Sequence, residues 1–297
     1  MSAPTYRTSL PPTLALLLAL MSPATAFAAD PGPSGLQFGA PMLTAPPRQP
    51  ISPQAPRRSA EANSASYDRC MKQALDDPAA ARKVAQGWRD RGGGHPAEHC
   101  LAVALIGLQQ YKDAATRLEA LAQSMVRAPA TLRAGVLGQA AQAWLLLGDP
   151  ERAYAADSSA LALRPDDPDL LVDRAAAAGT AGWFDKAIAD LDRVLKADPT
   201  RLDALIYRAS AQRAEGRLDP ALADIDAALK LAPDSVQALL ERGNIRGLRG
   251  DFDGAQADWR RVTAVAPGSD AATSAKKNIE RLNAGVMLPS ATPGKPR

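Results

Sequence analysis

Apolar positions repeat on two scales along this chain. Between residues 205 and 214 they recur at a mixture of three- and four-residue spacings, which predicts an amphipathic helix. A longer interval is marked by Pro165, Pro199, Pro233 and Pro267, which are 34 residues apart. A fixed period of about 20 to 50 residues indicates a solenoid, in which each unit buries its apolar face by stacking on the next. The pattern therefore predicts an all-helical stack.

Other columns keep the same period, and each has a physical meaning. Glycine suits a left-handed residue just past the end of a first helix, and an acidic residue in the first turn of a second helix complements its dipole. Small residues let the two helices approach closely, and proline ends the second helix. The columns are Leu137, Leu171, Leu205 and Leu239; Ala141, Ala175, Ala209 and Gly243; Gly148, Gly182, Gly216 and Gly250; Glu151, Asp185, Asp219 and Asp253; and Ala153, Ala187, Ala221 and Ala255.

In this spacing of small, glycine-turn and proline positions the sequence resembles the tetratricopeptide repeat (TPR) family. Four units match, at 134–167, 168–201, 202–235 and 236–269, whereas a unit at about 95–128 has Gln109 in place of the turn glycine. Residues 65–94 read as a degenerate helix pair, and 270–283 as a capping helix. The resemblance implies an all-α, right-handed α-solenoid of about five to six helix-turn-helix repeats over 65–283. In the degenerate pair we expect a packing face of Ala80, Ala81, Val84 and Trp88.

Both ends of the chain differ from this repeat region. Residues 1–28 have the features of a signal peptide: Arg7, a short apolar core and a small-x-small cleavage site ending at Ala28. Residues 29–64 are rich in proline and predict a disordered tether, and 284–297 predict a disordered tail. We expect a periplasmic or secreted protein with no integral membrane segment after cleavage; a retained N-terminal anchor is the alternative.

Composition argues against some functions. The formal net charge is +3 and aromatic residues make up 4% of the chain, so the basic, aromatic surface typical of nucleic-acid binding is missing from the sequence. The two cysteines, Cys70 and Cys100, predict one disulfide in an exported protein. Two buried thiols, or a metal site with His95 and His99, are the alternatives. Because His99 and Cys100 are sequence neighbours, they are poorly placed for a catalytic pair.

Two charged columns allow a structural and a functional interpretation. Arg174, Arg208 and Arg242 are 34 residues apart, and so are Asp190, Asp224 and Asp258. The matched aspartates favour a structural ladder over a row of arginines that awaits an acidic ligand. Asp157 departs from the repeat, because it occupies a position where the following units have apolar residues.

The TPR resemblance also implies a binding surface, since first helices line the concave groove in that family. We expect a protein or peptide partner, no cofactor and no catalysis, in a scaffold or adaptor of the bacterial cell envelope. A structural homo-oligomer is one alternative, and a metal-binding protein that uses the Cys/His cluster is another. The candidate groove residues are Val103, Ile106, Gln142, Leu145, Val172, Ile206, Ser210, Arg213, Leu240 and Asn244.

Overall fold

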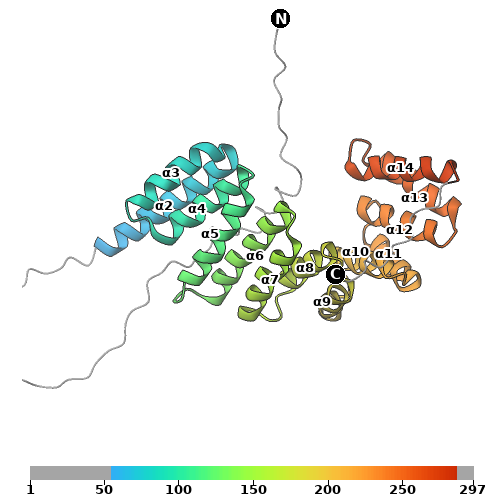
Figure 1. Ribbon diagram of the computed structural model, residues 1–297, viewed down its shortest axis with the longest axis horizontal. Helices are drawn as coiled ribbons and strands as arrows, with labels where there is room; N and C mark the ends of the chain where they lie inside the picture. Colours follow the sequence, from blue (N-terminus) through green and yellow to red (C-terminus); the bar gives the residue numbers. More distant parts are fainter. Residues whose placement is uncertain (1–54, 286–297) are drawn as a thin grey trace, which may run out of the picture. The chain divides into compact units, whose positions relative to one another are not determined.

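Helices account for all the regular secondary structure in residues 55–285, the range that the computed structural model describes, with side chains from residue 63. The expectations for the leader 1–28, for residues 29–54 and for residues 286–297 lie outside this range. The helices of the described range, drawn in Figure 1, are α2 (Ala55–Asp76), α3 (Pro78–Asp90), α4 (Gly94–Gly107), α5 (Tyr111–Ser124), α6 (Ala130–Leu147), α7 (Pro150–Leu163), α8 (Pro168–Thr180), α9 (Phe184–Ala197), α10 (Leu202–Ala214), α11 (Leu218–Leu231), α12 (Val236–Leu248), α13 (Phe252–Val265) and α14 (Asp270–Asn283).

The first helix begins earlier than the composition suggests. Because α2 starts at Ala55, the last ten residues of the tether expected at 29–64 are helical instead of disordered. The physical reason is the distribution of proline. Pro56 lies in the first turn, where its missing N–H costs nothing, and the next proline is Pro78, after the helix has ended.

The chain divides into two units, and α2, α3 and α4 form the first. Its core contains Ala74, Ala81 and Ala104, with Val103 packed against them. The expected packing face of α3 is partly wrong: Val84 is exposed, whereas Ala85 is buried beside Ala81. Ala81 and Ala85 are one helical turn apart, and Val84 lies off that stripe.

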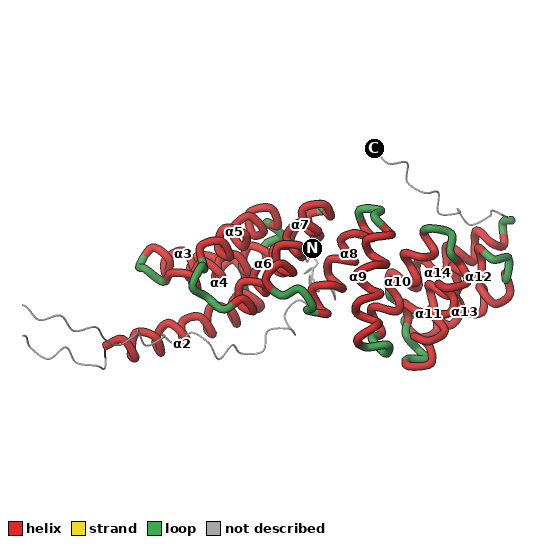
Figure 2. The backbone as a smooth tube through the Cα atoms, turned by 90° about the horizontal axis from the view of Figure 1, so that it is seen from below, coloured by secondary structure: helices red, strands yellow, loops and turns green. Residues whose placement is uncertain are grey.

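Helices α5 to α14 form the second unit, which begins at Gln109. From α5 to α14 each helix packs against the next one along the chain, and short loops join them (Figure 2). We call α6, α8, α10 and α12 the first helices of their pairs, and α5, α7, α9, α11 and α13 the second helices. The division between the units falls inside the expected 95–128 repeat, so that α4 and α5 lie in different units.

The turn glycines adopt the conformation that their column predicts. Gly148, Gly182, Gly216 and Gly250 have φ between 78° and 84°. At Gly148, this geometry lets its N–H bond the carbonyl of Leu145 and the next N–H bond that of Trp144. Gln109 keeps the same left-handed backbone, with φ 59°, although its Cβ makes this conformation costly.

Small residues allow close helix packing, and one of them has a specific opponent. A Cβ on Gly243 in α12 would come within 2.5 Å of the indole nitrogen of Trp259 in α13. Trp259 is fully buried, so the glycine is required by the tryptophan opposite it.

Asp157 lies in α7 at the core position that Leu191, Ile225 and Trp259 occupy in the following units. Its exposed fraction is 0%, and neither carboxylate oxygen has a hydrogen-bond partner. Burial, followed by repulsion from Asp173, raises its pKa well above the ordinary value, although the nearby Arg174 lowers it. A protonated carboxyl is therefore favoured in the folded core.

Candidate functional site

The arginine column forms a ladder that ties second helices to one another. Arg208 in α10 donates from Nε and Nη2 to both oxygens of Asp224 in α11, at 2.8 and 2.7 Å, and from Nη1 to Asp192 in α9, at 2.7 Å. Each rung of the ladder therefore links two successive pairs of helices. The structural interpretation of these columns is confirmed, because the arginines already have carboxylate partners.

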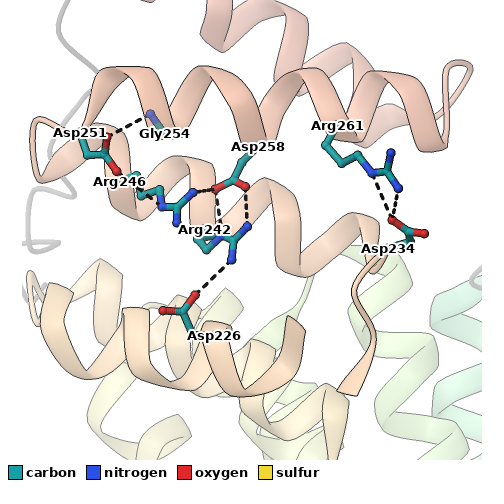
Figure 3. A network of polar contacts seen from close by, with 8 residues as sticks. All are labelled: Asp226, Asp234, Arg242, Arg246, Asp251, Gly254, Asp258 and Arg261. Atoms are coloured by element: carbon teal, nitrogen blue, oxygen red, sulfur yellow. Dashed lines mark hydrogen bonds and ion pairs between the residues drawn. The ribbon is translucent and has the colours of Figure 1, made fainter. Parts of the chain in front are cut away.

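The other two rungs follow the same geometry. Arg174 in α8 bonds both oxygens of Asp190, each at 2.7 Å, and its Nη1 donates to the hydroxyl of Ser158 at 3.3 Å. Figure 3 shows the third rung, where Arg242 in α12 lies between Asp258 of α13 and Asp226 of α11. These paired charges are partly buried, and each bidentate pair fixes the side chains in one orientation.

The candidate groove residues of the second unit lie on the four first helices. Gln142 and Leu145 are in α6, and Val172 is in α8. Helix α10 carries Ile206, Ser210 and Arg213, and α12 carries Leu240 and Asn244. Val172 is buried, with 5% of its surface exposed, so it packs inside the stack; the apolar members Leu145, Ile206 and Leu240 are half-buried. We refer to this set, without Val172, as the first-helix surface.

Val103 and Ile106 belong to α4 in the first unit. Both are half-buried, and Val103 packs against the alanine core of that unit. Intramolecular packing therefore occupies part of the Val103 side chain.

Three polar members of the first-helix surface, Gln142, Arg213 and Asn244, already have partners. Arg213 Nε donates to Glu241 at 2.6 Å, and Gln142 hydrogen-bonds Asp173. The Asn244 carbonyl oxygen accepts from the Trp259 indole at 3.3 Å and from Asn278 of α14 at 2.9 Å. A peptide that used the Asn244 amide would have to displace these bonds, so apolar contact is the main resource of this surface.

An acidic cluster beside these residues was missed by the sequence interpretation. Asp169 and Asp203 both bond Arg201, at 2.8 and 2.7 Å. Burial, followed by repulsion from Asp169, raises the pKa of Asp173 to about 6, although the hydrogen bond from Gln142 lowers it. Two carboxyl groups thus share the Arg201 guanidinium, and Asp173 lies close enough to both for their charges to raise its pKa. Asp169 and Asp203 are themselves 34 residues apart, which is the signal that could have revealed them.

An exposed aromatic ring borders this cluster. The exposed fraction of Tyr207 in α10 is 44%. Burial of its hydroxyl end and the neighbouring carboxylates of Asp203 and Asp173 raise the pKa of Tyr207. The first helices α8 and α10 therefore present an aromatic side chain next to excess negative charge.

The expected disulfide is confirmed. Cys70 of α2 and Cys100 of α4 are bonded, with Cα atoms 6.1 Å apart, and both are buried. The ring of His99, the residue before Cys100, shares a 2.7 Å hydrogen bond with the Tyr67 hydroxyl through Nδ1, and the rings of His99 and Tyr67 stack. Within residues 55–285 no group of three or more His, Cys, Asp or Glu side chains is arranged to hold a metal ion. In the same range, no helix has the length and apolar character needed to cross a membrane.

Comparison with solved structures identifies similar folds. A tetratricopeptide repeat protein from Parabacteroides merdae ATCC 43184 aligns with 74% of this chain and 88% of its own length, at 15% identity and a TM-score of 0.63. TTC0263, a thermophilic TPR protein of Thermus thermophilus, aligns with 63% of this chain and 100% of its own length, at 19% identity and a TM-score of 0.51. No protein-family model matches the sequence, and no curated protein matches it.

Proposed function

This chain has the tetratricopeptide-repeat fold, and we propose that it is a non-catalytic scaffold or adaptor that binds a peptide or helix of a partner protein on its first-helix surface. One observation carries the proposal. Leu145, Ile206 and Leu240 are only half-buried, on three first helices of one continuous stack, and Tyr207, the residue after Ile206, is exposed. Apolar side chains exposed along one surface are typical of an interaction site.

The charge beside this surface narrows the class of partner. Asp169 and Asp203 share the single guanidinium of Arg201, and Asp173 adds a third carboxyl group beside them. A segment with lysine or arginine next to apolar residues would bury its apolar side chains and neutralise the excess charge. We propose a basic, amphipathic segment as the ligand, bound as a helix or as an extended peptide.

The compartment is part of the same proposal. The features of residues 1–28 and the buried Cys70–Cys100 disulfide are both typical of proteins that leave the reducing cytosol. We propose a periplasmic or secreted protein of the bacterial envelope whose mature chain starts at Ala29. The mass of the protein purified from its native compartment tests this, because a chain that still begins at Met1 excludes cleavage.

The binding proposal is tested with a triple variant, Leu145→Asp, Ile206→Asp and Leu240→Asp. Proteins that copurify with the mature chain are identified by mass spectrometry and quantified again with the variant. We expect the specific partner to be lost. Leu231→Asp is the matched control, since Leu231 is 49% exposed at the end of a second helix and lies outside the surface. A partner retained by the triple variant rules out this surface.

Self-association is the alternative use of the same surface. Sedimentation equilibrium over a range of protein concentrations distinguishes the two. A mass that stays at one chain excludes a homo-oligomer, whereas a mass that doubles with concentration and returns to one chain in the triple variant replaces the proposal with self-pairing.

A further inference from the structure

The ladder fills the space between second helices with arginine side chains. The second helices α5, α7, α9, α11 and α13 are each 14 residues long, so their positions correspond one to one. The seventh residue accepts the bidentate arginine in three of them: Asp190, Asp224 and Asp258. The ninth residue of the preceding second helix accepts from the same guanidinium, and is Ser158, Asp192 or Asp226.

A further arginine fills the neighbouring space in two of the units. It comes from the tenth residue of the second helix. Arg193 in α9 donates to the carbonyl of Pro165 at 2.7 Å and to Asp166, and Arg261 in α13 bonds Asp234 at 2.7 Å. Figure 3 shows a unit with both arginines, Arg242 and Arg261, on their acidic partners.

All of these charged groups are missing from the unit formed by α6 and α7. The residue 34 positions before Arg174 is Ala140, and the seventh and tenth residues of α7 are Ala156 and Ser159. Only the acceptor in the preceding second helix is retained: the ninth residue of α5 is Glu119. The space between α5 and α7 therefore has an acidic acceptor, Glu119 of α5, without the arginine that bonds the equivalent acceptor in the following pairs.

A pocket lies where these side chains are missing. Its volume is about 380 Å³, within the range of small-ligand pockets, and it is formed by α5, α6 and α7 of the second unit. It lies between the second helices α5 and α7 and is also lined by Arg133 and Leu137 of α6; none of its lining residues belongs to the first-helix surface. The side chains that matter for recognition are Glu119, Arg133, Leu137, Ala156, Ser159 and Leu163.

Glu119 and Arg133 are each held by a hydrogen bond that leaves other atoms of the side chain able to bond a ligand. Glu119 Oε1 accepts the indole N–H of the buried Trp144 at 2.8 Å, which orients the carboxylate and leaves its second oxygen for another donor. Arg133 Nε donates to the carbonyl of Ala122 at 3.2 Å, which leaves the Nη donors for an acceptor on a ligand. A complementary ligand has a planar cation for Glu119, an acceptor for Arg133 and an apolar stem for Leu137 and Leu163.

We infer that this pocket binds an arginine group, supplied as the free amino acid or as a residue of a peptide, whose guanidinium takes the place of the missing rung. Arginine has each of the required parts: the guanidinium, a three-carbon stem, and a carboxylate or peptide carbonyl. In the three existing rungs the ninth-residue acceptor takes a single guanidinium N–H, and the second oxygen of Glu119 can accept the same bond.

Binding is measured through the Trp144 indole N–H signal in nitrogen–proton correlation spectra, assigned with a Trp144→Phe variant. Titration with L-arginine is expected to shift this signal with a roughly millimolar Kd, given the size of the ligand. L-Citrulline, the neutral analogue, is expected to bind at least about tenfold more weakly because the charge-assisted bond is lost. N-acetyl-L-arginine methylamide distinguishes the sources, since binding equal to that of L-arginine indicates a residue within a peptide and much weaker binding indicates the free amino acid.

Variants test whether the missing rung is the site. Glu119→Gln keeps an oxygen for Trp144 and removes the charge, so it should weaken the binding of L-arginine by at least about tenfold. The pair Ala140→Arg and Ala156→Asp rebuilds the rung and should abolish binding. If that pair does not fold, Ser159→Arg blocks the pocket from an exposed position, with Ala227→Arg as the matched control at the tenth residue of α11. The inference is overturned if L-arginine leaves the Trp144 signal unmoved, if citrulline binds equally, or if Ser159→Arg binds L-arginine as the control does.

Discussion

Replacing Asp157 by leucine is expected to stabilise the protein, and increasingly so as the pH rises. A buried polar group without a hydrogen-bond partner costs about 1–3 kcal/mol, and burying a leucine contributes about 1.5–3 kcal/mol. The added volume opposes this by about 1–3 kcal/mol, because the core around α7 is packed. Together these contributions give an expected net gain of about 1–3 kcal/mol in the free energy of unfolding for Asp157→Leu at neutral pH. The position accepts leucine in the next unit, where α9 has Leu191.

The pH dependence follows from the raised pKa of Asp157. In the unfolded chain the carboxyl ionises near its ordinary value of 3.8, whereas the folded chain retains the proton to higher pH. The folded state therefore binds more protons above that value, and its stability falls as the pH rises toward the folded pKa. The groups that set this pKa are Asp173 and Arg174 on α8 and Asp190 on α9, while α6 carries only one charged residue, Arg133.

Urea unfolding followed by circular dichroism at a series of pH values from about 4 to 8 measures both effects. Asp157→Asn should remove the pH dependence of the stability, because an amide does not ionise in this range. It should not raise the stability at low pH, because the buried amide also lacks a hydrogen-bond partner. Leu191→Asp is the reverse change in the next unit and should cost about 3–5 kcal/mol. The reasoning is refuted if Asp157→Leu is no more stable than the wild type at neutral pH, or if the difference between them is the same at every pH.

Four further outcomes are expected. Replacing Cys70 and Cys100 by serine should cost the first unit about 3–4 kcal/mol, measured by hydrogen exchange in α2 and α4; unchanged protection would contradict this. Asp173→Asn should flatten the fall in stability that the wild type shows between pH 4 and its pKa of about 6, as followed by urea unfolding, and an unaltered slope would exclude the effect. Arg208→Met should cost about 2–3 kcal/mol because Asp224 loses a bidentate partner, and Arg208→Lys should restore only part of it in the same assay. Gln109→Gly should stabilise the protein and Gly148→Ala should destabilise it, each by about 1 kcal/mol, since both positions are left-handed, and the thermal midpoint should rise and fall accordingly; equal midpoints would argue against strain.

The periodic part of the fold could be predicted from the sequence because equal columns make equal contacts. The turn at Gly216 and the rung at Arg208 each have counterparts 34 residues away, so one physical explanation served for several units. Where α2 begins could not be read in the same way. The proline-rich composition before residue 54 predicts disorder for the whole of residues 29–64, whereas helix formation after Pro56 depends on the helix propensity of the local residues.

The candidate surface was harder to predict because exposure depends on partners in other helices. Val172 has the spacing of a groove residue and is buried, and Asn244 is held by Trp259 and by Asn278 of α14. A column of equivalent positions does not show which side chains pair with one another across different helices. The pocket, in contrast, was visible in principle: Ala140 and Ala156 are departures from charged columns, and a missing side chain in a repeat leaves a space of known shape.

The arginine ladder also determines how far a local opening of the stack spreads. Because each rung joins two successive pairs, separating one pair removes bonds from its neighbour, and we expect the interfaces from α7 to α13 to open as one cooperative block. Helix α5 lacks the equivalent rung to α7, so it can detach without loss of a rung. A guanidinium bound at Glu119 would add α5 to the block, and the ligand would then change how many helices unfold together while the folded backbone stays the same.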